Sequence, residues 1–221
     1  MPHAPRRTYY DHEAAYRRIA EAGGTGWDDL FPGQVDDSYR AFGQFLASPF
    51  APPAARAIDL GCGGGQTSRE LAARGHDVTG VDFSETAIAL ARANVPGARF
   101  LVGDCLALAF ADGTFDLAID NHVLHCLIGD DRGQFLREVA RVLRPGGLLF
   151  CETMSREGEL DTGKLSIDPH TFVSLHGNRY WTTRAELDGE LARAGFSIVF
   201  RDDHEAGPGE GRNLTTYARR R

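Results

Sequence analysis

The amino-acid sequence predicts a doubly wound α/β fold, in which helices cover both faces of a mostly parallel sheet. Three observations indicate this class. From Arg56 onward, short apolar segments alternate with segments of helical periodicity. The connections between them are short, as in strand–helix–strand units. A glycine-rich turn, "GCGGG", follows the first apolar segment, at the position where an open parallel sheet binds its ligand.

The composition is that of one globular domain. The chain has 221 residues, of which 42% are hydrophobic and 25% charged, and this is enough for a well-buried core. The net charge of -7 argues against a protein that follows nucleic-acid phosphates. No apolar run approaches the ~20 residues of a membrane span. Four cysteines without a CxxC pair indicate reduced thiols. We therefore expect a cytoplasmic protein that binds neither nucleic acid nor membrane.

Residues 1–50 are expected to form a helical cap. The stretch "YYDHEAAYRRIAEA" has helical periodicity and stops at Gly23. A second helix is expected over "DDSYRAFGQFLASPF", with its end near Pro49. The linker "SPFAPPAAR" then leads into the main fold.

Residues 56–153 carry the regular alternation and form the expected cofactor-binding half. Short apolar segments predict strands, and the periodic segments between them predict helices that end at glycine or proline. Ser84 opens one of these helices as its N-cap. The expected strands cover 56–60, 77–83, 98–104, 115–120 and 148–154, and the expected helices cover 65–75, 84–95 and 130–147.

The alternation lapses after the fifth strand and then resumes. Residues 154–182 are expected to form a lid-like insertion. Residues 183–221 are expected to complete the single domain with a C-terminal helix and two strands. The helix is expected to end at Gly195, and the strands are "FSIVFRDDHE" and "RNLTTYARR".

The glycine-rich turn is the first sign of a ligand. Glycine lets the backbone turn tightly and lets a ligand approach closely, and the helix that follows aims free N–H groups at polar ligand atoms. Asp82 ends the second strand about 20 residues past the first glycine, where a carboxylate accepts hydrogen bonds from ribose hydroxyls. A dinucleotide and S-adenosylmethionine both fit this pattern. The dinucleotide fingerprint has a third glycine where this chain has Gln66.

The stretch "IDLGCGGGQTSRELAARGHDVTGVDFSETAIALAR" resembles the opening of the class I S-adenosylmethionine-dependent methyltransferase family. The stretches "FLVGDCLALAFADGTFDLAIDNHVLHCL", "FLREVARVLRPGGLLFCETM" and "AGFSIVF" resemble later parts of that family in the same order and spacing. The resemblance implies a Rossmann-like sheet of seven strands. Its last strand, expected over 212–220, is implied to run antiparallel. The resemblance also implies S-adenosylmethionine as the cofactor.

The resemblance implies a role for each matching residue at the cofactor. The turn from Gly61 to Gly65 is expected to cradle the methionine end, with Asp59 reaching toward the amino group. Asp82 matches the ribose-binding acid, and Phe83 is expected to pack on adenine. Asp82 and Asp104 each sit at a strand end with no obvious structural partner. The other expected cofactor residues are Cys62, Gly63 and Gln66 in the turn region, Asp104 and Cys105 near adenine, and Asp120 and Asn121 next to the sulfonium.

The methyl acceptor is expected where histidines follow the fourth strand. The candidate general bases are His122, His125 and His176. Two alternatives stay open. In the first, His125 and Cys126 pack beneath the cofactor, while His170 and His176 are surface loop residues. In the second, a metal is bound by His122, His125, Cys126, His170 and His176, although their spacing matches no tight site and no metal is expected. Further residues expected around the acceptor are Tyr9, Tyr10, Trp27, Phe31, Glu152, His170, Arg179, Tyr180 and Trp181.

These features predict a methyltransferase that acts on the N, O or S nucleophile of a small-molecule acceptor. The protein is expected to be a monomer or a homodimer. Two other functions stay open at this point. One is a noncatalytic module that binds S-adenosylmethionine, for which binding without turnover is predicted. The other is a nicotinamide-dependent oxidoreductase, which Gln66 and the "RPGG" before the fifth strand disfavour.

Overall fold

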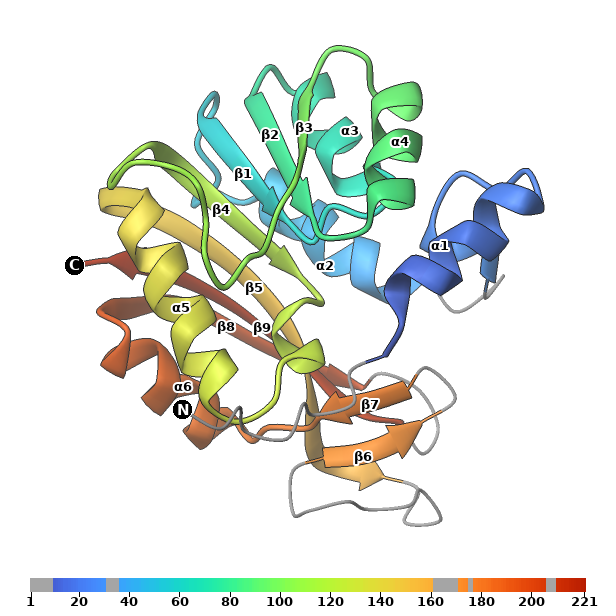
Figure 1. The fold of residues 1–221 in the computed structure, drawn as a ribbon. Coiled ribbons are helices and arrows are strands. Elements are labelled where there is room, and N and C mark those ends of the chain that lie inside the picture. Colours follow the sequence, from blue (N-terminus) through green and yellow to red (C-terminus); the bar gives the residue numbers. More distant parts are fainter. Residues whose placement is uncertain (1–9, 31–35, 161–170, 175–176, 206–209) are drawn as a thin grey trace, which may run out of the picture.

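A computed structural model of the protein describes residues 10–30, 36–160, 171–174, 177–205 and 210–221. Its main feature is a seven-stranded sheet in the order β3-β2-β1-β4-β5-β9-β8 (Figure 1). The strands are β1 (Arg56–Leu60), β2 (Asp77–Asp82), β3 (Arg99–Val102), β4 (Phe115–Asn121), β5 (Leu143–Leu160), β8 (Phe196–Glu205) and β9 (Glu210–Arg220).

The strand directions confirm the predicted topology. Strands β1 to β5 pair in parallel, whereas β9 lies between β5 and β8 and runs antiparallel to both. Because β1 has β2 on one side and β4 on the other, the chain reverses its direction of travel across the sheet at β1. The carboxyl ends of β1 and β4 therefore flank the switch point at which such folds bind ligands.

Helices cover both faces of the sheet, as predicted. On one face, α5 (Asp130–Val142) and α6 (Arg184–Arg193) bury Phe135, Leu136 and Leu187 in a single apolar cluster with the sheet. On the other face, α2 (Asp36–Ala47) and α3 (Gln66–Ala73) cover the sheet, and Phe42 and Phe45 of α2 pack on Phe150. The helix α4 (Glu85–Asn94) buries Ile88 against Phe100 of β3.

The N-terminal segment places α1 (His12–Glu21) next to α4, away from the sheet faces (Figure 1). Tyr16 and Ile19 of α1 are buried with Ala87 of α4. The short helix η1 (Trp27–Leu30) follows α1. As a result, α1 and η1 stand at the carboxyl edge of the sheet, where the ligand of such a fold lies.

Most elements differ from the expected boundaries by one to three residues, and α5 and β5 differ most. Helix α5 ends at Val142, whereas the sequence predicted that it continues to Gly147. Leu143 already pairs with Phe115 as the first residue of β5, and the register then shifts. Gly146 has a φ of +76°, a conformation that glycine adopts without steric cost. The strand is therefore irregular at its start but unbroken, and it continues to Leu160, with a second register shift between Ser155 and Leu160. Residues 154–160, which were expected to begin the lid-like insertion, therefore belong to the main sheet, because β5 pairs with β9 there.

The region expected as a lid-like insertion contains a small hairpin among its described residues. Strands β6 (Thr171–Ser174) and β7 (Gly177–Tyr180) pair antiparallel, and β7 packs against the short helix η2 (Leu124–Cys126) that follows β4. The hairpin therefore lies beside the loop that carries the candidate histidines. Within the described part of the chain, no helix is both long enough and apolar enough to span a membrane.

Candidate functional site

The glycine-rich turn after β1 is a tight backbone cradle. Gly61, Gly63 and Gly65 have φ values of +61°, +52° and +87°, which L-residues with a Cβ rarely adopt. A Cβ on Gly61 would lie 2.4 Å from Cγ2 of Val123, and a Cβ on Gly63 would lie 2.2 Å from the Tyr16 hydroxyl. The turn thus requires glycine for both its conformation and its neighbours.

Asp82 ends β2 and binds the turn directly. Its Oδ2 accepts a hydrogen bond from the Gly63 N–H at 3.0 Å, and its Oδ1 accepts one from the Ser84 N–H at 2.9 Å. Asp104, which is exposed, accepts from the Leu106 N–H at 2.8 Å. The expectation that these two carboxylates lack structural partners is therefore wrong. Burial raises the pKa of Asp82, although each of its oxygens keeps a lone pair for a further donor.

Asp59 lies beneath the turn in full burial. Its Oδ2 accepts a hydrogen bond from the Ser68 hydroxyl at 2.6 Å, and burial raises its pKa to about 7. Cys62 is buried and Cys105 is half-buried, and burial raises the pKa of both thiols. These thiols stay protonated near neutral pH and act as small apolar groups.

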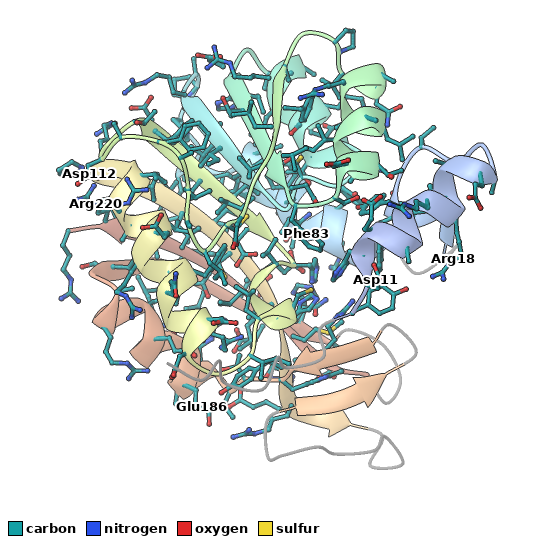
Figure 2. All side chains as sticks on the ribbon, in the orientation of Figure 1. Asp11, Arg18, Phe83, Asp112, Glu186 and Arg220 are labelled. Carbon is teal, nitrogen blue, oxygen red and sulfur yellow. The ribbon has the colours of Figure 1, made fainter. Side chains whose placement is uncertain are left out.

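Exposed apolar side chains lie at the carboxyl ends of β2 and β3. Phe83 is 57% exposed, and Leu101 and Val102 are also exposed. In Figure 2 the labelled Phe83 lies between the end of β2 and the start of α1. The His12 ring of α1 meets Phe83 edge-on at 5.7 Å. An exposed aromatic ring beside a buried carboxylate suits a flat apolar group such as a nucleobase.

Residues of the N-terminal segment hold it against the turn and α4. Glu13 accepts hydrogen bonds from the hydroxyls of Ser84 and Thr86 at 2.6 and 2.7 Å. At the other end of α4, the Asn94 amide donates to the carbonyl oxygens of Thr25 and Gly64, both at 2.8 Å. Close packing of Gly26 on the Gln66 amide leaves no room for a Cβ. The cap is therefore fixed over the turn at both ends of α4.

The segment after β4 is organised by Asp120, which is fully buried. Its Oδ1 accepts from the N–H groups of Val123 and Leu124, and its Oδ2 accepts from the Cys151 thiol at 3.2 Å. Burial raises its pKa to about 6. The Asn121 amide donates to Thr67 at 3.4 Å, while its Oδ1 is buried with no partner among the described residues.

His122 has a backbone conformation that non-glycine residues rarely adopt. It is the one non-glycine residue in the described part of the chain with a positive φ, at +76°. Such conformations cost free energy and cluster at functional sites. The conformation brings Nε2 of His122 to 3.7 Å from Oε1 of Glu152. Burial lowers the pKa of His122, and the Glu152 carboxylate opposes that effect.

Glu152 is fully buried at the middle of a small cluster. His204 of β8 approaches the same oxygen, with its Nε2 3.5 Å from Oε1. Neither oxygen of Glu152 has a hydrogen-bond partner among the residues that the structure describes. His122, Glu152 and His204 therefore form one group, which we call the His–Glu–His cluster. Its members come from the end of β4, from β5 and from β8.

The other candidate histidines differ in their surroundings. His125 is buried with its ring 5.1 Å from that of His122, and burial holds its pKa well below the usual range. The Cys126 thiol donates to the His122 carbonyl at 3.5 Å and lies 4.0 Å from the His12 ring. The expected residues that lie outside the described part of the chain are His170, His176, Tyr9 and Phe31.

The remaining residues expected around the acceptor come from both flanks of the site. Tyr10 and Trp27 are in edge contact at 5.9 Å, and the Arg179 guanidinium of β7 lies 5.4 Å from the Tyr10 ring. Tyr180 stacks instead on Arg132 of α5. Within the described residues, no three histidine, cysteine or acidic side chains are arranged to hold a metal ion.

Sequence reasoning missed three residues that the fold brings to this site. Tyr16 and His12 lie on α1, where helical periodicity gave no sign that they face the glycine turn and Phe83. His204 lies in the run "RDDHE" at the end of β8, in which every residue is polar or charged, so a histidine there gave no signal of a buried partner.

Comparisons with known proteins agree with this geometry. The family model described as "Methyltransferase domain" matches residues 58–151. The chain is 30% identical to a ubiquinone biosynthesis O-methyltransferase of Methylobacterium nodulans, covering 86% of this chain and 82% of that protein. It is 34% identical to the EEF1A lysine methyltransferase 4 of Bos taurus, covering 58% and 59%.

A solved structure shares the fold over nearly the whole chain. It is the 1,6-didemethyltoxoflavin-N1-methyltransferase of Burkholderia thailandensis, solved with 1,6-didemethyltoxoflavin and S-adenosylhomocysteine bound. The TM-score is 0.72 at 21% identity, covering 99% of this chain and 92% of that one.

Proposed function

Because the chain belongs to the class I S-adenosylmethionine-dependent methyltransferases, we propose that it methylates a small-molecule acceptor with His122 as the general base. The observation that carries this proposal is the strained backbone of His122, which points its imidazole at the buried carboxylate of Glu152. Membership of this family also removes the oxidoreductase alternative.

The described residues fit S-adenosylmethionine at the carboxyl ends of β1, β2 and β3. The cradle at Gly61 and Gly63 admits a close backbone approach to the methionine end of the cofactor. Asp59 lies beneath that end, where its carboxylate would favour an ammonium group. The hydroxyl of Tyr16 lies over Gly63 of the same turn.

The adenosine end fits the neighbouring strand ends. Asp82 keeps lone pairs for the ribose hydroxyls in addition to its two backbone hydrogen bonds. Phe83 and the exposed Leu101 offer the apolar surface for adenine, and Asp104 with Cys105 lies at the next strand end. Asn121 has a buried Oδ1 without a partner among the described residues, next to Thr67 in the first turn of α3.

When bound, the cofactor supplies an electrophilic methyl group on its sulfonium. The protein's part is to place the acceptor, exclude water and remove a proton. If Nε2–H of His122 points to Glu152, the ring's other nitrogen, Nδ1, is left as the basic atom. Nδ1 then takes the proton of the acceptor's O–H, N–H or S–H group. The Glu152 carboxylate stabilises the imidazolium that forms, as in other oriented histidine bases.

His122 is a better base than His125 in this geometry. Both rings are close together, but His125 is 4% exposed and its pKa lies well below the usual range. His122 keeps 22% of its side chain exposed and has a carboxylate beside it. A base needs both access to the acceptor and a partner for its charged form. His125 instead is a buried residue of η2 itself.

A small acceptor suits the covered site. The α1 and η1 segment lies over the glycine turn, and the β6–β7 hairpin lies beside η2. The acidic net charge of -7 disfavours a nucleic acid. The names of the relatives point to different acceptors, because one is an O-methyltransferase of ubiquinone biosynthesis and another is a lysine methyltransferase. The covered geometry favours the small-molecule class.

The class of the methyl acceptor is tested by offering the protein low-mass compounds, proteins and nucleic acids in one experiment. The protein is incubated with methyl-tritiated S-adenosylmethionine and a cell extract separated into low-mass, protein and nucleic-acid fractions. We expect label in the low-mass fraction, and we expect His122→Gln to lose it. His76→Gln is the matched control, because His76 is a buried histidine that directly precedes β2, at the end of that strand that lies away from Asp82. Label confined to the protein fraction would overturn the small-molecule proposal.

A further inference from the structure

His204 reaches the site from a strand that the methyl-transfer chemistry does not otherwise use. It lies on β8 and pairs in register with Asn213 of β9, which in turn pairs with Met154 of β5. Its side chain is 13% exposed, and its Nε2 lies 3.5 Å from Oε1 of Glu152. His122 approaches the same oxygen at 3.7 Å from the other side of the cluster. Two imidazoles thus share one carboxylate oxygen.

None of the described residues makes a hydrogen bond to the Glu152 carboxylate in the structure. Cross-strand pairing places Asn121 and Thr215 on either side of it. The buried oxygens of both side chains are themselves without partners in the described part of the chain, as is Oδ1 of Asn213. A fully buried carboxylate that makes no hydrogen bond stays ionised only when a positive charge lies beside it. Among the described residues, His122 and His204 are the two groups in ion-pair range of it.

Only one of the two histidines needs to carry that charge. If His122 carried it, its imidazole would hold a proton already and could not accept another. The electrostatics favour His204 instead. The carboxylate of Glu152 raises the pKa of His204, and Asp202 adds to that effect while burial and Arg40 of α2 oppose it. Burial lowers the pKa of His122. The Glu152 carboxylate opposes that effect, whereas the charges of His204 and Arg179 lower the pKa further.

We propose that His204 is a positioning residue for methyl transfer, because it supplies the positive charge that balances buried Glu152 and so leaves the His122 imidazole neutral. This inference rests on the proposed role of His122 as the base. Without His204, the buried carboxylate takes its counter-charge from His122. The His122 imidazole is then protonated at pH values at which it is unprotonated in the unaltered protein.

The test follows the His122 imidazole directly and needs no methyl acceptor. Histidine Cε1–H signals are titrated by NMR in the full-length protein, and the His122 signal is identified by its loss in His122→Gln. We expect His204→Gln to raise the His122 pKa by roughly one unit or more, because the cation that competes for the carboxylate is gone. We expect the double variant Glu152→Gln/His204→Gln to restore a low His122 pKa, because no buried charge then remains.

Two further readouts keep the result interpretable. His204→Lys keeps a positive charge, and it is expected to leave the His122 titration unchanged, which guards against a variant that only loosens the fold. An unchanged His122 pKa in a folded His204→Gln variant would overturn the proposal. A raised His122 pKa without any shift in the pH dependence of methyl transfer would leave the charge balance standing and would remove His122 as the base.

Discussion

Nε2 of His122 lies 3.7 Å from Oε1 of Glu152, at the point where the parallel pairing of β4 with β5 ends. The two residues occupy adjacent register positions, because Asn121 pairs with Glu152 and His122 follows directly. A positive φ of +76° at His122 turns the ring toward the carboxylate. Local strain at one residue therefore links the cofactor end of the sheet to a buried acid.

Replacement of Asp82 is expected to weaken cofactor binding. Asp82→Ala removes a carboxylate that holds the Gly63 and Ser84 N–H groups and faces the proposed ribose site. Hydrogen bonds to charged groups contribute about 1.5–3 kcal/mol each, so we expect the Kd for S-adenosylmethionine to rise at least tenfold. Asp77→Ala, at the exposed first position of the same strand, is the control. Calorimetric titration measures both, and an unchanged Kd for Asp82→Ala would refute the ribose role.

Gly63 and Gly75 allow backbone strain to be separated from a steric clash. Both have positive φ, at +52° and +84°, but a Cβ on Gly75 meets nothing within 4 Å, whereas one on Gly63 meets the Tyr16 hydroxyl. Gly75→Ala should cost about 1–2 kcal/mol of unfolding free energy through its backbone alone. Gly63→Ala should cost more and should also weaken S-adenosylmethionine binding.

The clash at Gly63 has its own rescue. Tyr16→Phe removes the atom that lies closest to the added Cβ, so Gly63→Ala/Tyr16→Phe should regain part of the lost stability. Chemical denaturation of Gly63→Ala, Gly75→Ala, Tyr16→Phe and the double variant gives the comparison. Equal losses for Gly63→Ala and Gly75→Ala would mean that α1 does not pack on the turn in solution.

The contact between Glu13 and α4 predicts a pH-dependent loss of stability. Hydrogen bonds from Ser84 and Thr86 lower the pKa of Glu13 from 4.5 to about 2. A group with a depressed folded-state pKa stabilises the fold above its unfolded pKa, and this stabilisation is lost as pH falls through the folded value. The stability difference between the unaltered protein and Glu13→Gln should therefore be constant above about pH 5 and should vanish between pH 4.5 and 2.

The control for this prediction lies on the same helix. Glu85 is exposed in the first turn of α4, so Glu85→Gln changes the charge near the same helix terminus without breaking the contact to α1. Denaturation curves at several pH values measure both variants. If Glu13→Gln and Glu85→Gln behave alike, the contact to α1 contributes nothing measurable.

Much of the fold followed from periodicity and turn residues. Alternating apolar and helical segments predicted each of the seven main strands, and β8 has the predicted bounds of 196–205. The end of α5 and the start of β5 were not predicted, because Pro145, Gly146 and Gly147 were interpreted as the residues that stop the helix. In the structure, strand pairing of Leu143 with Phe115 already ends the helix. Strand pairing therefore sets the end of this helix, and the local preference of the residues does not.

Less of the site than of the fold could be predicted from the sequence. The glycine turn and Asp82 are close in sequence and follow a known spacing, so they could be predicted as a pair. His122 was a candidate among several histidines, and its positive φ gave no signal in the residue letters. His204 and Tyr16 reach the site only through long-range packing of β8 and α1. Such contacts depend on the assembled sheet and cap, and no local pattern encodes them.

The most direct test of the account is single-turnover methyl transfer by His122→Gln, with the acceptor that the extract fractions provide. The protein is first loaded with S-adenosylmethionine, and S-adenosylhomocysteine is then measured after rapid quenching. We predict that the rate falls by about 100-fold or more, as expected for a lost general base, while the Kd for S-adenosylmethionine stays unchanged and His76→Gln keeps the full rate. Transfer by His122→Gln at the rate of the unaltered protein would contradict the role of His122 as the general base.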